Sequence, residues 1–170
     1  MPIYPTTVKN FSVYGPQGLE VGVADITLPH VQWEKDTLKG ATLAGSANLG
    51  VQGNMQPMET TITWHTNTKQ ALALFGPGGV RIRCLSSIYM CDTSSGEIDE
   101  EPEEIIMTVW GAGYNQGKRE PSTKGGVALA FDVTYLALYF AGQKWWELDF
   151  WNNVAIVAGV DVNAKTRANL

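Results

Sequence analysis

Apolar and polar residues alternate along much of the chain, with the period of two that is typical of half-buried antiparallel strands. The alternation is clearest in Met58–His65 and Val80–Met90. Further predicted strands are Val8–Tyr14, Val21–Trp33, Ile105–Trp110, Lys144–Phe150 and Val154–Ala158. The chain is therefore predicted to be mainly β.

The strongest predicted strand is Val127–Phe140, whose first half has one apolar and one polar face. From Leu136 onward, Leu138 and Phe140 make the second face apolar as well. A strand that is apolar on both faces must be covered on both. We expect a helix or a neighbouring subunit to supply the second cover.

One short helix is predicted, at Lys69–Phe75. Residues 66–68 offer capping side chains in front of it. Leu72 and Phe75 form an apolar face at helical spacing. The glycines and proline of residues 76–79 end the segment.

Three segments lack apolar periodicity and are predicted to be loops. Residues 34–55 are rich in Gly, Ala, Thr and Asn, and compact domains seldom carry so long a loop without a use for it. Residues 92–104 form a predicted acidic hairpin loop. Residues 114–126 form a polar loop that carries Lys118, Arg119 and Lys124.

The net charge of −5 is distributed unevenly along the chain. Seven acidic residues and no basic residue lie between positions 92 and 104: Asp92, Glu97, Asp99, Glu100, Glu101, Glu103 and Glu104. Without these seven negatives the remaining residues sum to +2. This balance argues against a protein that grips nucleic acid, which requires a basic face.

The length and composition favour a single folded domain over residues 1–170, because 44% of the residues are hydrophobic. No apolar run approaches the ~18–20 residues of a membrane helix. The first residues lack the basic flank and apolar stretch of a signal peptide. We expect a protein that acts where it is made, without stable membrane association.

Residues suited to catalysis or metal binding are few. The two histidines, His30 and His65, have no partner at metal-ligand spacing. Cys84 and Cys91 are too few for a zinc site or a disulfide framework, and on one strand they would point to opposite faces. The acidic run lacks the central glycine of an EF-hand loop. We expect no catalytic, cofactor-binding or metal site, and no enzyme.

Aromatic residues crowd into the predicted hairpin at Lys144–Phe150. Trp146 and Phe150 share one face, whereas Trp145 lies on the other and Trp151 follows in the turn. Exposed tryptophan often marks a protein–protein contact. Trp145 and Trp151 therefore either form a contact surface or belong to an internal cluster.

Several segments together resemble the major tail tube proteins of contractile-tailed phages and R-type bacteriocins. The first group is Ile26–Val31, Leu38–Ala41 and Ala44–Ala47, a strand ending in Thr-Leu-Pro followed by a Gly/Ala-rich loop. The second group is Val133–Leu138, Gly142–Lys144, Glu147–Asp149 and Gly159–Asp161, which matches the closing hairpin and last strand of that family. The resemblance spans Val8 to Asp161 and rests on the order and spacing of these segments. The chain departs from the family in its Trp-rich closing strand and its acidic run.

The resemblance implies an antiparallel β-sandwich or partly open barrel with one short flanking helix. Six copies would form a ring, and rings would stack into a tube that sheath contraction drives through the envelope of a target cell. The implied partners are further copies of the chain, the tail sheath protein, baseplate and tail terminator proteins, and the tape measure protein in the lumen. DNA would pass only through a phage. The particle would be a virion tail or a bacteriocin assembled in the bacterial host cytoplasm.

The resemblance also assigns roles to particular residues. The segment 34–55 resembles the part of the family that reaches the adjacent ring, with candidate contacts at Leu38, Lys39, Gly40, Ala41, Leu43, Ala44 and Ser46. Contacts within the ring or to the sheath are expected at Trp145, Trp151, Leu136 and Leu138. The acidic residues Glu97, Asp99, Glu100, Glu101, Glu103 and Glu104 have no assigned direction, whether lumen, sheath or next ring.

Two alternative functions stay open at this stage. One is a related tube, either the stacked-ring protein of type VI secretion or a non-contractile tail tube. The other is a small β-barrel module that binds a ligand or carbohydrate through Trp145, Trp146 and Trp151. A concave aromatic pocket in a monomer would favour the second.

Overall fold

The computed structural model describes residues 3–18, 22, 25–40 and 44–170. After β1 (Ile3–Tyr14) and a 3-10 turn (Pro16–Gly18), the elements are β2 (Asp25–Thr27), β3 (Trp33–Lys39), β4 (Ser46–Met55), β5 (Met58–Trp64), α1 (Lys69–Leu74), β6 (Val80–Asp92), β7 (Ile98–Asn115), β8 (Val127–Phe140), β9 (Gln143–Asp149), β10 (Val154–Val157), β11 (Val160–Asp161) and α2 (Ala164–Asn169). The prediction of a mainly β chain is confirmed.

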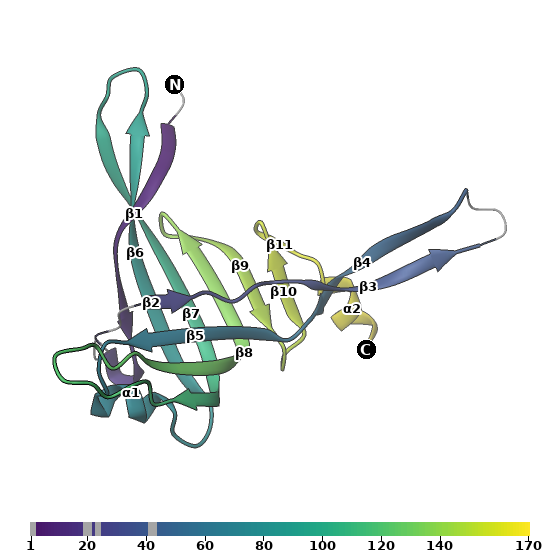
Figure 1. The fold of residues 1–170 in the computed structure, drawn as a ribbon. Coiled ribbons are helices and arrows are strands. Elements are labelled where there is room, and N and C mark those ends of the chain that lie inside the picture. The colour runs from purple at the N-terminus through teal and green to yellow at the C-terminus, as the bar shows by residue number, and fades with distance from the viewer. Residues whose placement is uncertain (1–2, 19–21, 23–24, 41–43) are drawn as a thin grey trace.

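The main sheet is antiparallel and divides at β8. Its strands follow the order β1-β6-β7-β8-β9-β10-β11, while β5 pairs with β8 and β2 pairs with β5. Residues 127–133 of β8 pair with β5, whereas residues 135–140 pair with β9. Figure 1 shows β2 and β5 crossing in front of the strands β6 to β9. The body is therefore a two-layered, partly open sandwich, and the predicted fold class is confirmed.

A β-bulge at Thr134 marks the division of β8. Thr108 of β7 is paired with Tyr135 and Val109 with Val133, so that Thr134 is the extra residue. The indole Nε1 of Trp110 donates to the Thr134 hydroxyl (3.2 Å), and the amide of Phe150 donates to its carbonyl (3.1 Å). Because a bulge adds one residue, it reverses which side chains face inward.

Because of this bulge, the side chains of β8 that follow Thr134 point to the faces opposite to those predicted. Leu136, only 7% exposed, belongs to the same core as Val133, and Leu138 packs against that core. The sequence pattern had suggested that these leucines lie on the face opposite Val133. The second half of β8 turns the leucines inward, and Tyr135 hydrogen-bonds instead to Glu147 on β9.

The core lies between the two layers and takes side chains from both. Its largest fully buried members are Trp64, Phe131, Ile62, Leu74, Ile82, Met107, Leu129 and Leu148. Trp64 and Ile62 come from β5, and Met107 from β7 on the other layer. Outside the second half of β8, the alternation in the sequence therefore indicated which residues the core buries.

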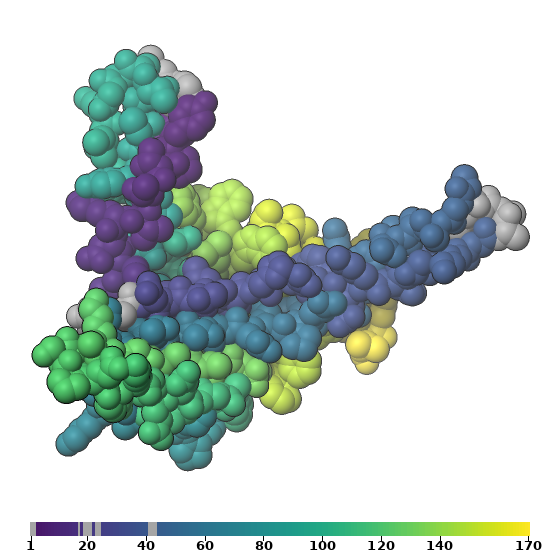
Figure 2. All heavy atoms as spheres, in the orientation of Figure 1, coloured from purple at the N-terminus to yellow at the C-terminus, as the bar shows by residue number. Residues whose placement is uncertain are grey.

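Most of the described residues in 34–55 lie in two paired strands, and the prediction of a loop there was wrong. β3 and β4 pair as a separate two-stranded sheet, which we call the arm. Figures 1 and 2 show the arm projecting away from the body. Both faces of the arm are exposed over most of its length. Because neither face is covered, its residues show no apolar alternation, which is why the pattern suggested a loop.

The acidic run is also mostly strand, contrary to the prediction of a loop at residues 92–104. β6 continues to Asp92, residues 93–97 make the turn, and β7 begins at Ile98. With the first half of β1, the ends of these strands form a three-stranded projection, which we call the ribbon: residues 3–10, 85–92 and 98–102. Figure 1 shows the ribbon extending beyond the body with the N-terminus beside it.

The helices are short and flank the sheets. α1 begins as predicted, because the hydroxyl of Thr68 accepts a hydrogen bond from the amide of Ala71 (3.1 Å). α2 follows in the C-terminal tail and was not predicted. Within the described residues, neither helix has the length and apolar character needed to cross a membrane.

Candidate assembly surfaces

The arm has one partly apolar face and one polar face. Leu38 lies opposite Ala47 and Asp36 opposite Leu49, and residues that are opposite each other share a face. Leu38 and Leu49 are 51% and 55% exposed. The other face carries Lys35, Thr37, Lys39, Ser46 and Asn48, with the Thr37 hydroxyl bonded to the Asn48 amide oxygen (2.9 Å). An apolar surface held this far from the body suits contact with another protein.

The residues predicted to contact the next ring lie at the outer end of the arm. Leu38 and Lys39 end β3, and Gly40 follows them. Ala44 precedes β4 and Ser46 is its first residue. The remaining two predicted contacts, Ala41 and Leu43, fall outside the described residues.

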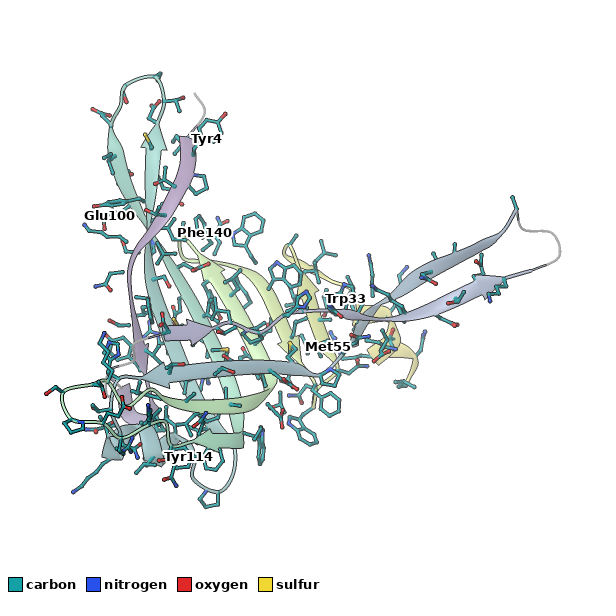
Figure 3. All side chains as sticks on the ribbon, viewed as in Figure 1. Tyr4, Trp33, Met55, Glu100, Tyr114 and Phe140 are labelled. Atoms are coloured by element: carbon teal, nitrogen blue, oxygen red, sulfur yellow. The ribbon has the colours of Figure 1, made fainter. Side chains whose placement is uncertain are left out.

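The direction of the arm is fixed at its base. Trp33 and Met55 lie where the arm joins the body (Figure 3) and pack against the core. The carbonyl of Gly53 accepts a hydrogen bond from the Asn163 amide nitrogen (3.2 Å), which also donates to Asn153 Oδ1 (2.8 Å). Gly53 has φ +93°, and an added Cβ would lie 1.8 Å from Asn163 Oδ1. Only glycine fits this junction.

The C-terminal segment holds Asn163 in place. Asn163 is 4% exposed, and its own amide donates to Asp161 Oδ1 (3.0 Å). Arg167 pairs with Asp161 and donates to the carbonyl of Asn153 (2.9 Å). The guanidinium of Arg167 lowers the pKa of the Asp161 carboxyl. Sequence reasoning missed this group, since a single buried asparagine leaves no periodic signal.

The ribbon carries the acidic residues together with exposed apolar side chains. Glu100 accepts hydrogen bonds from Lys9 and from the Ser87 hydroxyl (2.7 Å), which lower its pKa. The exposed apolar residues of the ribbon are Ile3, Tyr4, Val8 and Ile98. Figure 3 places Tyr4 and Glu100 on this projection, away from the core. Glu97 lies in the turn, while Asp99 and Glu101 extend along β7.

The two remaining acidic residues have other surroundings. Glu104 forms an ion pair with Arg83 across β6 and β7. Glu103 lines an apolar groove of about 290 Å³ with Leu28, Pro29, Val31, Ile105, Leu136, Leu138 and Trp146. Burial raises the pKa of the Glu103 carboxyl. The predicted acidic residues therefore lie in three separate environments: the ribbon, the ion pair with Arg83 and the apolar groove.

The predicted contact set at the Trp-rich hairpin is not one surface. Trp145 and Trp151 are exposed, at 43% and 69%, whereas Leu136 and Leu138 face the core side and line the groove. The Asp149 carboxylate accepts from the amides of Trp151 (3.0 Å) and Asn152 (3.1 Å), which fixes the turn. Trp146 lies in the groove, so the three tryptophans of the carbohydrate-binding alternative do not share one concave site.

Charged and tyrosine side chains interlock on the outer face of the main sheet. The Tyr135 hydroxyl donates to Glu147 (2.9 Å), and Lys144 pairs with the same carboxylate (2.9 Å). Burial, together with this hydrogen bond, raises the pKa of Tyr135 to about 12. Arg81 lies over the ring of Tyr135, 5.9 Å from its centre. Lys144 and Glu147 thus neutralise each other on this face.

The residues considered for chemistry occupy ordinary structural positions. Cys84 and Cys91 are both free thiols, and burial raises the pKa of the Cys84 thiol. The ring of His30 hydrogen-bonds to the Gln32 side chain. The carbonyl of His65 accepts the amide of Gly125 (2.7 Å). Among the described residues no three His, Cys, Asp or Glu side chains gather as a metal site.

Solved structures of contractile injection systems share this fold. A chain of the sheath–tube complex of PVC, an extracellular contractile injection system in the extended state, is 9% identical; the match has a TM-score of 0.52 and covers 80% of this chain and 92% of that one. A chain from the sheath/tube terminator of PVC, also extended, is 9% identical with a TM-score of 0.53, covering 80% and 97%. No curated protein matches the sequence.

The sequence itself matches one family model over nearly its whole length. Residues 5–170 match the family described as phage tail tube protein FII. This match confirms the resemblance to major tail tube proteins that the ordered segments indicated. The family is a structural one, and its members are not catalysts. The chain belongs to the phage tail tube protein FII family and is a structural tail tube subunit.

Proposed function

We propose that six copies of this subunit close into a ring, and that the rings stack into the inner tube of a contractile tail or tail-like particle. The tube is a passive conduit that sheath contraction drives through the envelope of a target cell. The subunit performs no chemistry in this role. Its function is the geometry of its contacts with further copies and with neighbouring tail proteins.

The arm carries this proposal. A two-stranded hairpin is at best marginally stable alone in water, yet β3 and β4 extend with Leu38 and Leu49 exposed. Covering these side chains with the adjacent ring removes them from water. The buried anchorage of Gly53 by Asn163 keeps the arm extended before that contact forms. The arm thus serves as the inter-ring contact.

Among the described residues, the outer half of β1, residues 3–10, offers a strand edge that supports ring closure. β1 has 12 residues and ends the order of the main sheet. A long, free strand edge invites pairing with another chain. In a ring, each subunit presents this edge to its neighbour, and closure of the ring leaves no free edge. The exposed Trp145 and Trp151 belong to the same ring contact or to the sheath contact.

A subunit of such a tube would contact several other tail proteins. The similar PVC chains come from complexes of sheath with tube and of the tube terminator. We infer corresponding contacts of this subunit with a sheath protein, a tail terminator and a baseplate. A tape measure protein occupies the lumen during assembly in the bacterial cytoplasm, and DNA passes through only in a phage.

Deletion of residues 37–47 tests this proposal. The described residues of this segment, 37–40 and 44–47, are exposed, so the variant keeps the thermal unfolding and circular dichroism of the parent. Negative-stain microscopy of the parent shows rings and tubes, and the deletion variant shows rings alone. Tubes of the deletion variant would refute the assignment of the arm. A parent that stays monomeric at high concentration would refute the ring.

A further inference from the structure

A basic pocket lies at the end of the body opposite the ribbon. β7 ends at Asn115, and residues 116–126 return the chain to β8. The pocket holds about 480 Å³ and is lined by Thr66, Asn67, Lys118, Arg119, Glu120, Pro121, Thr123 and Gly125. Figure 1 shows this loop beside α1, far from the ribbon. The pocket has no role in the arm or edge contacts described above.

Backbone hydrogen bonds hold the pocket in shape before any partner binds. The amide of Lys118 donates to the carbonyl of Gly125 (2.9 Å), and the amide of Gly125 donates to that of His65 (2.7 Å). A Cβ on Gly117 would lie 1.8 Å from the Gly125 carbonyl oxygen. The loop is therefore closely packed on itself and tied to the end of β5. A partner can therefore bind without a prior conformational change of the loop.

The pocket and its rim are cationic. The loop carries Lys118, Arg119 and Lys124 against the single acid Glu120. Lys118 pairs with Glu120, and Arg119 is held by the carbonyl of Gln116 (2.8 Å). This leaves an excess of positive charge around a concave site. Such a site fits an acidic segment of protein.

The acidic segment with the complementary charge is at the other end of the same strand. The 18 residues of β7 span about 60 Å at ~3.3 Å per residue, with the acidic turn before them and the basic loop after them. Figure 3 shows Glu100 on the ribbon and Tyr114 at the opposite end. The ribbon tip has five acidic residues, Asp92, Glu97, Asp99, Glu100 and Glu101. Among the described residues, Lys9 is the one cation paired with them.

We propose that the pocket formed by residues 66–67 and 116–125 receives the β6–β7 hairpin tip of a second copy in the adjacent ring. The inference rests on the proposed stacking of rings. The two ends cannot meet within one chain, and a head-to-tail contact that does not close continues indefinitely as a stack. Two acidic tips repel each other, as do two basic pockets. This contact therefore gives the tube its polarity, a role distinct from that of the arm.

Charge reversal at each end tests the contact in the full-length protein. The pocket variant is K118E/R119E/K124E and the tip variant is E97K/D99K/E101K. Each has like charges at both ends, so each forms rings without tubes in microscopy and sedimentation at low salt. Mixed together, the two variants have complementary ends again and form tubes of alternating rings. K165E, on exposed α2, is the control and stacks as the parent does.

The outcomes separate this inference from the function on which it rests. Tubes from either reversed variant alone, at the length and yield of the parent, would overturn the tip-in-pocket contact. Rings of both variants whose mixture does not stack would overturn it as well. A parent protein that gives neither rings nor tubes would instead contradict the proposed tube. Matching circular dichroism and thermal unfolding of all variants confirm that the rings compared are of folded protein.

Discussion

The sandwich body and its two projections, the arm and the ribbon, differ in how far their side chains are buried. In the body, side chains such as Phe131, Met107 and Trp64 are fully buried between two layers. In the arm beyond its buried base at Gly53, and in ribbon residues 3–10 and 98–102, most side chains are exposed, whereas the β6 part of the ribbon is half-buried. Apolar burial stabilises a fold by about 25 cal/mol per Å², so the free energy of folding is concentrated in the body.

The difference indicates where single-chain stability and assembly can be separated. We expect a substitution in the body to change the free energy of unfolding, whereas in the proposed tube one in a projection changes contacts between copies. The junction at Gly53 and Asn163 connects the two regions, because the hydrogen bond and close packing there fix the arm relative to the body. The following variants test this division in order of decreasing effect on unfolding.

Truncation of the core has the largest expected effect. Phe131→Ala removes a fully buried ring on β8 and leaves a cavity between the layers. We expect the free energy of unfolding to fall by about 3–5 kcal/mol. Urea unfolding followed by tryptophan fluorescence measures the change. Leu49→Ala on the arm is the control, with a change within about 0.5 kcal/mol; equal losses in the two variants would contradict the division.

A methyl group at the junction affects both regions. Gly53→Ala places a Cβ on Asn163 at a backbone φ that suits glycine, so we expect a loss of about 2–4 kcal/mol. Because the arm must then shift, tube formation is also reduced. Gly45→Ala is the matched control: its φ is also positive, at +143°, but nothing lies within 4 Å of the added carbon.

The two glycine variants are compared by urea unfolding and by the yield of tubes in sedimentation. The control loses about 1 kcal/mol or less, through backbone strain alone. If Gly53→Ala assembled as well as Gly45→Ala did, Asn163 would not be the residue that directs the arm.

The two regions also differ in how far the sequence could predict them. The strands of the body were recovered because alternation reports burial, and Val127–Phe140 matches β8 in full. The arm and the acidic run at residues 92–104 were predicted to be loops because strands with mostly exposed faces need no alternation. In the ribbon, Glu100 is held by Lys9 from β1, a pairing that spans 91 positions and leaves no local signal.

Single-residue features of the body were beyond the sequence pattern for a related reason. The bulge at Thr134 reverses the faces of β8, and the sequence around Val133, Tyr135 and Leu136 contains no pattern that predicts it. The site at Asn163 depends on the close approach of Gly53, 110 positions away. The family resemblance, in contrast, was accessible because it rests on short local segments whose order the fold preserves.

Polar substitution of the apolar face of the arm separates stability from assembly. L38S/L49S replaces two exposed leucines, so the free energy of unfolding changes by less than about 0.5 kcal/mol. Tube formation falls steeply, because the variant has little apolar surface to cover at the next ring. T37A/N48A on the polar face is the matched control and assembles as the parent does. If the control lost tubes while the leucine variant kept them, the opposite face of the arm would be the contact.

The smallest effect distinguishes two carboxylates of one strand by pH. Burial in the groove raises the pKa of Glu103 above its usual 4.5, so its folded form keeps the proton longer than the unfolded chain does. Its contribution to stability is thus present below pH 4.5 and is lost as the pH rises through the folded pKa. Lys9 lowers the pKa of Glu100, so that this contribution is present above pH 4.5 and is lost as the pH falls.

Glu103→Gln and Glu100→Gln should therefore change the pH dependence of unfolding in opposite directions. Relative to the parent, Glu103→Gln gains stability as the pH rises from 4 to 7, because it no longer ionises in the groove. Glu100→Gln loses stability relative to the parent as the pH rises from 3 towards 5, because it no longer gains the ion pair with Lys9. Thermal unfolding across these ranges measures both. Parallel changes in the two variants would mean that groove and ribbon place their carboxylates in equivalent surroundings, which the contrast between body and projection forbids.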